Sequence, residues 1–331
     1  MKIFITGASG YIGCELAHQL ANGGHTVHAF VRSECSSKLL LHPNIKIFVG
    51  DILDVSSISV AIRGCRQVYH TAAFVRISAR DHNKFYLHNV TGTENVLESA
   101  LTHGIERLVY TSSCGVWGVT GDHIFTEKDP RIAAYDNDYE VSKLMAERVV
   151  LHYCTRGLNC IIVNPTKVFG FGTHPHPDRM NYNTYLNDWF RKKVILLPWK
   201  LKVTSNLAFI QDVIQGHLLA MKMGISGEKY ILGGDNLSIS NVIATINLLA
   251  DEKKYFIRVP GSIIFLWAVY EVLSSRIRRR DPLIVPAMIG RISKHAKYSS
   301  RRAVEQLGYR ITPFQQAMQQ TMNDAKRFTY E

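Results

Sequence analysis

The sequence lacks the features that would place it outside the ordinary globular proteins. Its 331 residues contain no internal repeat or low-complexity segment, and 46% hydrophobic with 20% charged residues excludes a mostly disordered, collagen-like or coiled-coil chain. A chain of this length can form one large α/β domain or two smaller ones with an ample core. Composition therefore predicts a folded protein without indicating what it does.

Paired cysteines and long apolar runs are also absent. None of the six cysteines belongs to a C-x-x-C pair, so neither a disulfide framework nor a zinc knuckle is indicated. The apolar stretch after Lys2 is too short for a signal peptide, and the longest apolar run, residues 263–270, falls short of the ~20 residues of a spanning helix. We expect a reducing, cytoplasmic location.

Charge is unbalanced, with a formal net charge of +12. The basic residues are spread along the chain except for clusters at 191–193 and 276–280, and no nucleic-acid motif accompanies them. An anionic cofactor explains part of the excess, and nucleic acid is not an expected partner. The apolar and then basic segment 263–280 could contact a membrane surface peripherally, although such helices are more often buried in a small substrate domain.

Short apolar runs alternate with helical periodicities in the first half of the chain. We predict strands at 2–6, 26–31, 45–49, 67–70, 107–111 and 159–164, and helices at 12–21, 55–62, 83–103 and 139–156. Such alternation predicts an α/β fold with a doubly wound parallel sheet over residues 1–170. A smaller, mainly α-helical substrate domain is expected over 171–331, except for a piece near 205–234, with a strand at 229–232, that returns to the main sheet.

A glycine-rich loop, TGASGYIG, occupies residues 6–13 between the first strand and the first helix. Glycines let the backbone turn tightly and approach a pyrophosphate, which then meets the amides at a helix N-terminus. The strand before and the helix after supply the context that this motif requires. The predicted cofactor contacts in this loop are Gly7, Ser9, Gly10, Tyr11, Ile12 and Gly13.

The end of the second strand indicates which dinucleotide is preferred. Arg32 stands where an acidic residue would bind the ribose hydroxyls of NAD, and a guanidinium suits a 2′-phosphate. We therefore predict NADP(H), with Lys38 as a weaker second contact, although Glu34 nearby keeps NAD(H) open. After the third strand, Asp51 and Ile52 are placed to bracket an adenine ring, unless Asp51 merely caps the next helix.

Tyr139 and Lys143 begin a predicted helix and share one face of it. A nearby ammonium stabilises tyrosinate and lowers the phenol pKa from about 10, as a general acid/base for alcohol and ketone interconversion requires. The spacing is common by itself. It gains weight from the glycine loop upstream and from the hydroxyl residues 111–113 at the end of the fifth strand.

Residues 6–13, Ser113, Tyr139 and Lys143 together resemble the extended short-chain dehydrogenase/reductase superfamily of the NAD-dependent epimerase/dehydratase type. That group holds sugar-nucleotide epimerases, dihydroflavonol reductases and 3β-hydroxysteroid dehydrogenases. Segments 51–52, 70–73, 89–93 and 164–170 fall where the family carries its adenine, nicotinamide and active-site segments, and the resemblance clearly spans about the first 235 residues. It implies a Rossmann fold and an NAD(P)-binding oxidoreductase.

The resemblance also implies roles for single residues. Tyr139 would transfer the substrate proton, Lys143 would hold the nicotinamide ribose and lower the tyrosine pKa, and Ser113 would hydrogen-bond the reacting oxygen. Asn89 would support the lysine through water, and Ser112 would replace Ser113 if the register slips by one. Further cofactor contacts implied are Thr71, Ala72, Ala73, Pro165 and Val168.

Departures from the family pattern favour its dihydroflavonol reductase-like branch. Trp117 stands where epimerases usually have tyrosine, and residues 206–208 lack the arginine that holds a diphosphate there. We predict an NADP(H)-dependent oxidoreductase that interconverts a ketone or aldehyde and an alcohol on a ring-containing or lipophilic small molecule. A nucleotide-sugar epimerase/dehydratase is the alternative, and a non-catalytic NADP(H)-binding sensor, which generally lacks the tyrosine, is the second.

Three further expectations concern the pocket, metals and assembly. Phe74, Trp117, Phe169 and Tyr182 would line an apolar substrate pocket unless they simply fill core. The loop with His174, His176 and Asp178 matches no ligand spacing, so no metal is predicted. Relatives often dimerise through the helices here at 83–103 and 139–156, which makes a homodimer the expected assembly.

Overall fold

The structure is a computed structural model of the chain. It describes residues 1–33, 38–76, 81–171, 194–198, 202–250, 255–278, 280–282, 284–286, 289 and 294–329.

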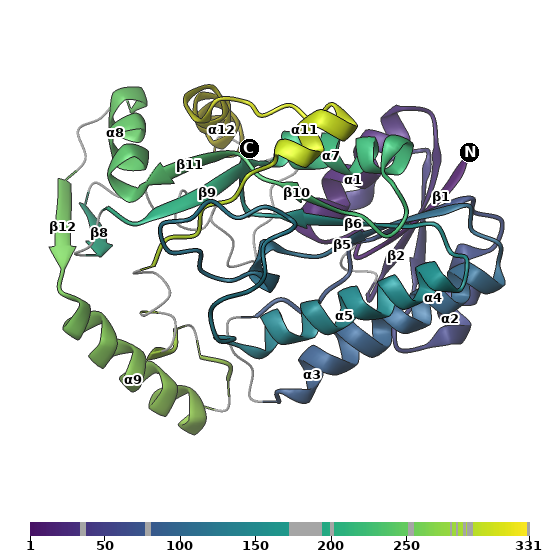
Figure 1. Ribbon diagram of the computed structural model, residues 1–331, viewed down its shortest axis with the longest axis horizontal. Coiled ribbons are helices and arrows are strands. Elements are labelled where there is room, and N and C mark those ends of the chain that lie inside the picture. Colours follow the sequence, from purple (N-terminus) through teal and green to yellow (C-terminus); the bar gives the residue numbers. More distant parts are fainter. Residues whose placement is uncertain are drawn as a thin grey trace.

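A seven-stranded parallel sheet forms the centre of the molecule (Figure 1). Its strand order is β10-β6-β5-β4-β1-β2-β3. Their bounds are β1 (Lys2–Thr6), β2 (Thr26–Val31), β3 (Ile45–Val49), β4 (Gln67–His70), β5 (Arg107–Thr111), β6 (Cys160–Pro165) and β10 (Lys229–Leu232). The predicted strands are confirmed, with only the sixth displaced by one residue. Segment 229–232 returns to the sheet as predicted, because β10 pairs in parallel with β6.

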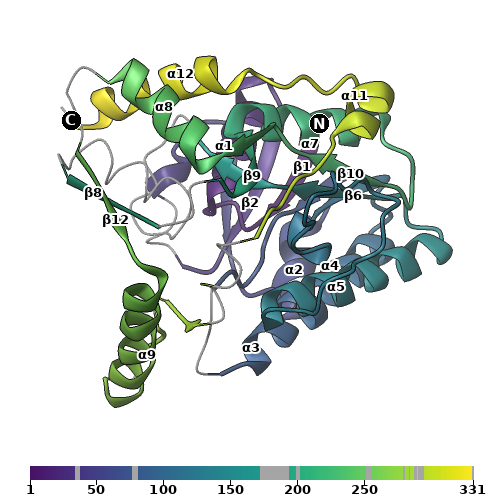
Figure 2. The same cartoon turned by 60° about the vertical axis from the view of Figure 1, so that its left-hand side comes forward.

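Helices cover both faces of this sheet (Figures 1 and 2). On one face, α2 (Val55–Ile62), α4 (Gly92–Thr102) and α5 (Asp138–Thr155) share a core with the sheet. On the other, α1 (Tyr11–Asn22) and α7 (Ile210–Met223) do the same. Burial of both faces explains why the strands read as nearly continuous apolar runs.

The predicted helix at 83–103 has three parts. It begins as α3 (Asn83–Tyr86), widens into the π-helical turn η2 (Leu87–Thr91) and continues as α4. A period of 3.6 residues cannot anticipate this widening, since π turns depend on tertiary contacts and often lie at functional sites.

Smaller elements extend one end of the molecule. A three-stranded sheet joins β7 (Lys167–Phe169), β9 (Thr204–Phe209) and β11 (Asp235–Ser238), and β8 (Val194–Pro198) pairs with β12 (Tyr255–Val259). The helices there are α8 (Ile239–Leu249), α9 (Gly261–Ile277), α11 (Arg301–Leu307) and α12 (Phe314–Thr329). Residues of α8, α11 and α12 pack into the same core as α1 and α7. Within the described ranges, no helix combines the length and apolar character needed to cross a bilayer.

Candidate functional site

The loop after β1 lies where the strand order of the sheet reverses, between β1 and β4. Open α/β sheets bind ligands at this point. The loop is closely packed, because a Cβ on Gly7 would lie 2.7 Å from Ala72 Cα, and one on Gly13 would lie 2.2 Å from the carbonyl oxygen of Gly7. Gly7 also has a φ of 67°, which favours glycine. Only glycine fits at these two positions, so no side chain there stands between the backbone and a bound group.

The N-terminus of α1 adds a site for negative charge. Gly10 is its N-cap, and no side chain among the described residues caps it. Amides in a first helical turn make no intrahelical bond and carry the positive end of the helix dipole, so this end fits a pyrophosphate. Ser9 and Ile12 are half-buried beside it. The hydroxyl of Tyr11 donates to the carbonyl of Gly170, which ties the loop to the end of β7.

The predicted adenosine contacts follow neighbouring strands. Arg32 directly follows β2 and is exposed, and Lys38 is also exposed. Asp51 does not cap α2, since its carboxylate accepts from the amide of Leu53 at 2.9 Å and the N-cap of α2 is Asp54. Ile52 is buried beside Gly92 of α4, where an added Cβ would lie 2.6 Å from its side chain.

His70, a buried histidine without a role in the sequence analysis, connects Thr6 at the start of the glycine loop to Thr93 of α4. The Thr93 hydroxyl donates to the carbonyl of Asn89 at 2.7 Å, so it accepts from His70 Nε2 at 2.9 Å. Nδ1 then carries no proton and accepts from the Thr6 hydroxyl at 2.6 Å. Burial lowers the pKa of His70 to about 3, and the charge of Lys143 adds to the effect. The imidazole is therefore neutral with one defined tautomer.

Asn89 lies in the π turn and binds two segments directly. Its amide oxygen accepts from the backbone N–H of Phe74 at 2.7 Å, and its Nδ2 donates to the carbonyl of the same residue at 3.2 Å. Nδ2 also donates to the hydroxyl of Ser142 at 2.9 Å. The side chain thus fixes the segment after β4 against α5, next to Lys143. Its support of the lysine through water stays a prediction.

Side chains around the start of α5 set the position of Tyr139. Asn137 caps the helix by accepting from the amide of Glu140 at 2.9 Å. Glu140 is buried and pairs with Arg131 at 2.5 Å. Asp138 accepts from His82 and Tyr86 at 2.6 and 2.8 Å. These contacts hold the half-buried Tyr139 one turn before Lys143 on the same helix face.

Lys143 is almost fully buried, at 1% exposure, and reaches the end of β5. Its Nζ donates to the carbonyl of Thr111 at 2.7 Å and lies 4.4 Å from the ring centroid of Tyr110. Burial lowers the pKa of Lys143 to about 7, and the negative charge of Glu147 opposes this shift. Two residues beyond Thr111, Ser113 caps the short 3₁₀ turn η3 (Cys114–Val116) by accepting from an amide at 3.0 Å.

Glu147 is a site residue that sequence reasoning missed. It is buried one turn beyond Lys143 and accepts from Ser112 at 2.6 Å, Asn164 at 2.7 Å and Lys229 at 2.5 Å. The hydroxyl of Ser112 is committed to this carboxylate, so Ser112 is the wrong alternative to the half-buried Ser113. A glutamate four residues after the lysine was the available signal.

Two of the predicted pocket aromatics are core residues instead. Phe169 is 1% exposed and packs against Phe209 and Phe314, while Trp117 is 5% exposed and donates its indole N–H to the carbonyl of Asp129. Their side chains are enclosed by protein and offer no surface to a substrate. Phe74 is half-buried, and Tyr182 lies outside the described residues. Pro165 is buried at the end of β6, and Val168, Thr71, Ala72 and Ala73 are half-buried.

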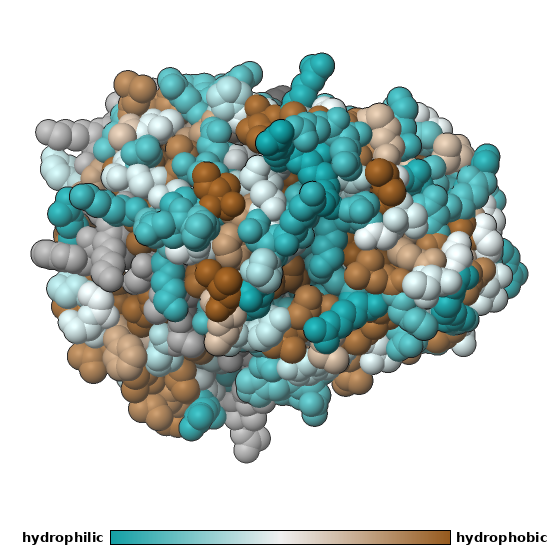
Figure 3. All heavy atoms as spheres, viewed as in Figure 1, coloured by the Kyte–Doolittle hydropathy of each residue, from teal (hydrophilic) through white to brown (hydrophobic). Residues whose placement is uncertain are grey.

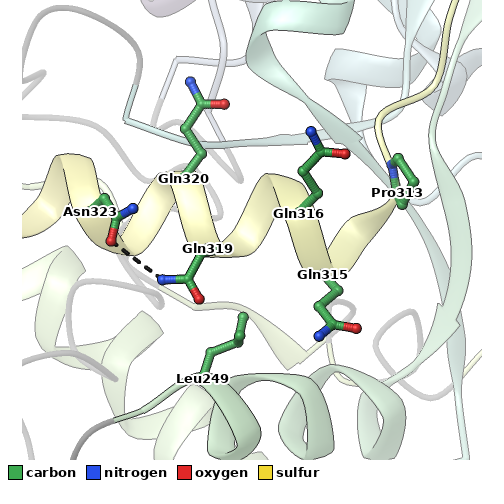
Figure 4. A pocket seen from close by; sticks show the side chains of 7 residues that line it. All are labelled: Leu249, Pro313, Gln315, Gln316, Gln319, Gln320 and Asn323. Carbon is green, nitrogen blue, oxygen red and sulfur yellow. Dashed lines mark hydrogen bonds between the residues drawn. The ribbon is translucent and has the colours of Figure 1, made fainter.

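A groove elsewhere on the surface does not compete with this site. It runs beside α12 and is lined by Leu249, Pro313 and the polar residues Gln315, Gln316, Gln319, Gln320 and Asn323 (Figure 4). The side chains point to different sides of the helix, and none of them titrates. This groove therefore offers no side chain for acid–base chemistry.

Burial of Lys143 predicts a pH-dependent stability. Above pH 7 the native lysine loses its proton while the unfolded one, with an ordinary pKa near 10.4, keeps it, so wild-type stability rises with pH in this window. Lys143→Met lacks this gain. Its free energy of unfolding relative to wild type should therefore fall by about 2 kcal/mol between about pH 6 and about pH 9. Urea unfolding at both values measures this, and a constant difference would contradict the burial argument.

Comparison with known proteins agrees with this geometry. The profile of the NAD dependent epimerase/dehydratase family matches residues 3–233. A putative dihydroflavonol 4-reductase from Synechocystis sp. is 29% identical over 324 residues, 95% of this chain and 92% of that protein. Sterol demethylase protein B from Methylococcus capsulatus is 30% identical over 268 residues, 80% of this chain and 79% of that protein.

A solved structure supports the fold. A double mutant of dTDP-glucose 4,6-dehydratase from Streptomyces venezuelae, with NAD bound, superposes with a TM-score of 0.78 at 20% identity, covering 99% of this chain and 97% of that one. With the family profile covering more than half of the sequence, the assignment is direct. The chain belongs to the NAD dependent epimerase/dehydratase family of extended short-chain dehydrogenases/reductases and is an NAD(P)-dependent enzyme.

Proposed function

We propose that this enzyme uses NADP(H) to interconvert a ketone or aldehyde and an alcohol on a ring-containing or lipophilic small molecule. The observation that carries the proposal is the placement of Lys143. Lys143 follows Tyr139 by one helical turn, and its amine is held at the carbonyl of Thr111, the last residue of β5 and two residues before Ser113. This arrangement suits proton transfer to a carbonyl oxygen at the cofactor edge of the sheet.

The chain's own groups supply the acid–base part of the reaction. Tyr139 would give its phenol proton to the carbonyl oxygen during reduction, and Lys143, when protonated, would stabilise the resulting tyrosinate. Ser113 would hydrogen-bond the same oxygen. The residues of the glycine loop, Arg32 and the 71–73 segment would hold the dinucleotide, which supplies the hydride when bound.

Residues 206–208 favour a reductase over an enzyme for nucleotide sugars. None of the three is basic, and all are buried. The amide of Asn206 is occupied by the protein itself, because it accepts from Thr166 and Gly234 and donates to Asn236. No side chain of this stretch is left to bind a diphosphate. The similarity to a putative dihydroflavonol 4-reductase and to sterol demethylase protein B also supports an organic ring substrate.

The experiment that tests the proposal measures cofactor oxidation with a panel of aromatic ketones, sterol ketones and nucleotide sugars. We expect net oxidation of NADPH with at least one ketone. Interconversion of a nucleotide sugar without net consumption of cofactor would instead support the epimerase.

Arg32→Ala tests the cofactor preference in the same assay. Loss of a charge-assisted contact to the 2′-phosphate should weaken NADPH binding about tenfold to a hundredfold and leave NADH binding nearly unchanged. Fluorescence titration of both nucleotides against both proteins measures this. Arg63→Ala, at the exposed C-cap of α2, is the control. Equal losses for the two nucleotides in Arg32→Ala would rule out the phosphate contact.

A further inference from the structure

Helix α9 presents its apolar side to solvent and its small or polar side to the protein. A surface helix normally does the opposite. The residues that face the body are nearly inaccessible, namely Ala268 at 0%, Glu271 at 4% and Ser275 at 2% exposure. The opposite face is a stripe of large side chains at helical spacing. These are Ile263, Leu266, Trp267, Tyr270, Leu273 and Ile277, and each is more than half exposed.

The position of α9 makes this stripe accessible. The helix projects from one end of the molecule, away from the central sheet (Figures 1 and 2). In the space-filling view, hydrophobic side chains gather on the surface at the same corner (Figure 3). The strand β12 leads directly into α9 and adds the exposed Tyr255 and Ile257, which pair with the exposed Val194 and Leu196 of β8.

Charge and aromatic content indicate what would cover the stripe. Tyr270 and Trp267 have the amphipathic rings that favour the boundary between lipid headgroups and acyl chains. Arg276 and Arg278 are exposed at the C-terminal end of the helix. The only carboxylate of α9, Glu271, is buried and pairs with Arg280 at 2.5 Å. Helix α9 itself therefore offers apolar area and, with Arg278 at its C-cap, positive charge without an exposed carboxylate, and the nearest exposed carboxylate along the chain is Asp281, just beyond Arg280.

We propose that α9 docks on an anionic lipid membrane. The helix lies in the plane of the surface, with the stripe at the headgroup boundary and Arg276 and Arg278 on acidic headgroups. A second copy of this chain would supply no counter-charge to the two arginines from its own α9, whereas anionic lipid does. The proposal stands independently of the proposed reaction, since it rests on the exposed face of α9 alone.

Flotation of the full chain with vesicles tests the docking. Wild type should float with vesicles of phosphatidylcholine mixed with phosphatidylglycerol, and less so as salt is raised. Arg276→Gln with Arg278→Gln should lower the partition coefficient about thirtyfold, because each basic residue near such a surface contributes about a fivefold factor. Leu266→Ser with Trp267→Ser should lower the partition coefficient on the same mixed vesicles about tenfold or more.

Controls separate docking from misfolding and from self-association. Leu41→Ser changes a leucine that is 82% exposed on the part of the chain between β2 and β3, and it should float like wild type. All variants should keep the wild-type thermal midpoint and NADPH affinity, as the substituted side chains are exposed. The proposal would be overturned if the wild type did not float, or if all variants floated equally with it. It would also be overturned if the α9 variants differed from the wild type in oligomeric state while none of the proteins bound vesicles.

Discussion

Tyr139→Phe should lower turnover on the order of 10²-fold or more while leaving the affinity for NADPH nearly unchanged. The substitution removes only the hydroxyl, so the ring still packs at the start of α5 and Lys143 keeps its bond to the carbonyl of Thr111. What is lost is the group that donates a proton to the substrate oxygen. Steady-state kinetics with a ketone substrate and a nucleotide titration measure the two quantities separately.

The same helix supplies a matched control for this experiment. Tyr153 lies near the other end of α5, where its hydroxyl donates to Glu98 at 2.7 Å. Tyr153→Phe removes an equivalent hydroxyl at a distance from the proposed chemistry and should leave turnover close to wild type. If Tyr139→Phe also retained full turnover, another group would have to donate the proton and the role proposed for Tyr139 would be wrong. A wild type without turnover on any substrate of the panel would instead support a non-catalytic NADP(H)-binding sensor.

Gly13→Ala should disrupt the glycine loop, because the added methyl group would overlap the backbone of the loop itself. The added Cβ would lie 2.2 Å from the carbonyl oxygen of Gly7 and 2.7 Å from the hydroxyl of Thr71, and the first of these is backbone that cannot rotate away. Overpacking of this kind costs about 1–3 kcal/mol of stability. Because the displaced atoms form the loop itself, we also expect NADPH affinity to fall about tenfold or more.

Gly23→Ala at the other end of α1 is the matched control. There an added Cβ would lie 3.3 Å from the nearest atom, the carbonyl oxygen of Leu20, and φ is −75°. Thermal unfolding and nucleotide titration of both variants compare the two sites. Wild-type affinity in Gly13→Ala would show that the loop tolerates movement and would argue against its role as a pyrophosphate cradle.

Local sequence signals predicted the parallel sheet and its helices well, because they depend on short-range periodicity and caps. Strands β1 to β5 and helix α2 occupy the predicted residues. The glycine loop could also be placed, since its meaning depends on the adjacent strand and helix. Each of these features depends mainly on residues that are close together in the sequence.

Where a feature depends on contacts between residues distant in sequence, the prediction missed it or was wrong. Glu147 is recognisable as a site residue only when Ser112 and Lys229 are seen to converge on it. Phe169 was expected in a pocket, yet Phe209 and Phe314 enclose it. An aromatic side chain has the same sequence pattern whether it lines a cavity or fills a core, and only the packing distinguishes the two.

The single hydrogen-bonding pattern around His70 makes the rim of the cofactor site rigid. Rotating the imidazole would break its bonds to Thr6 and Thr93 together. His70 therefore links the first strand, the fourth strand and α4 through side-chain hydrogen bonds at this edge. If a nucleotide binds at this edge as proposed, it meets side chains whose hydrogen bonds are already formed, so we expect little conformational entropy to be lost in ordering them.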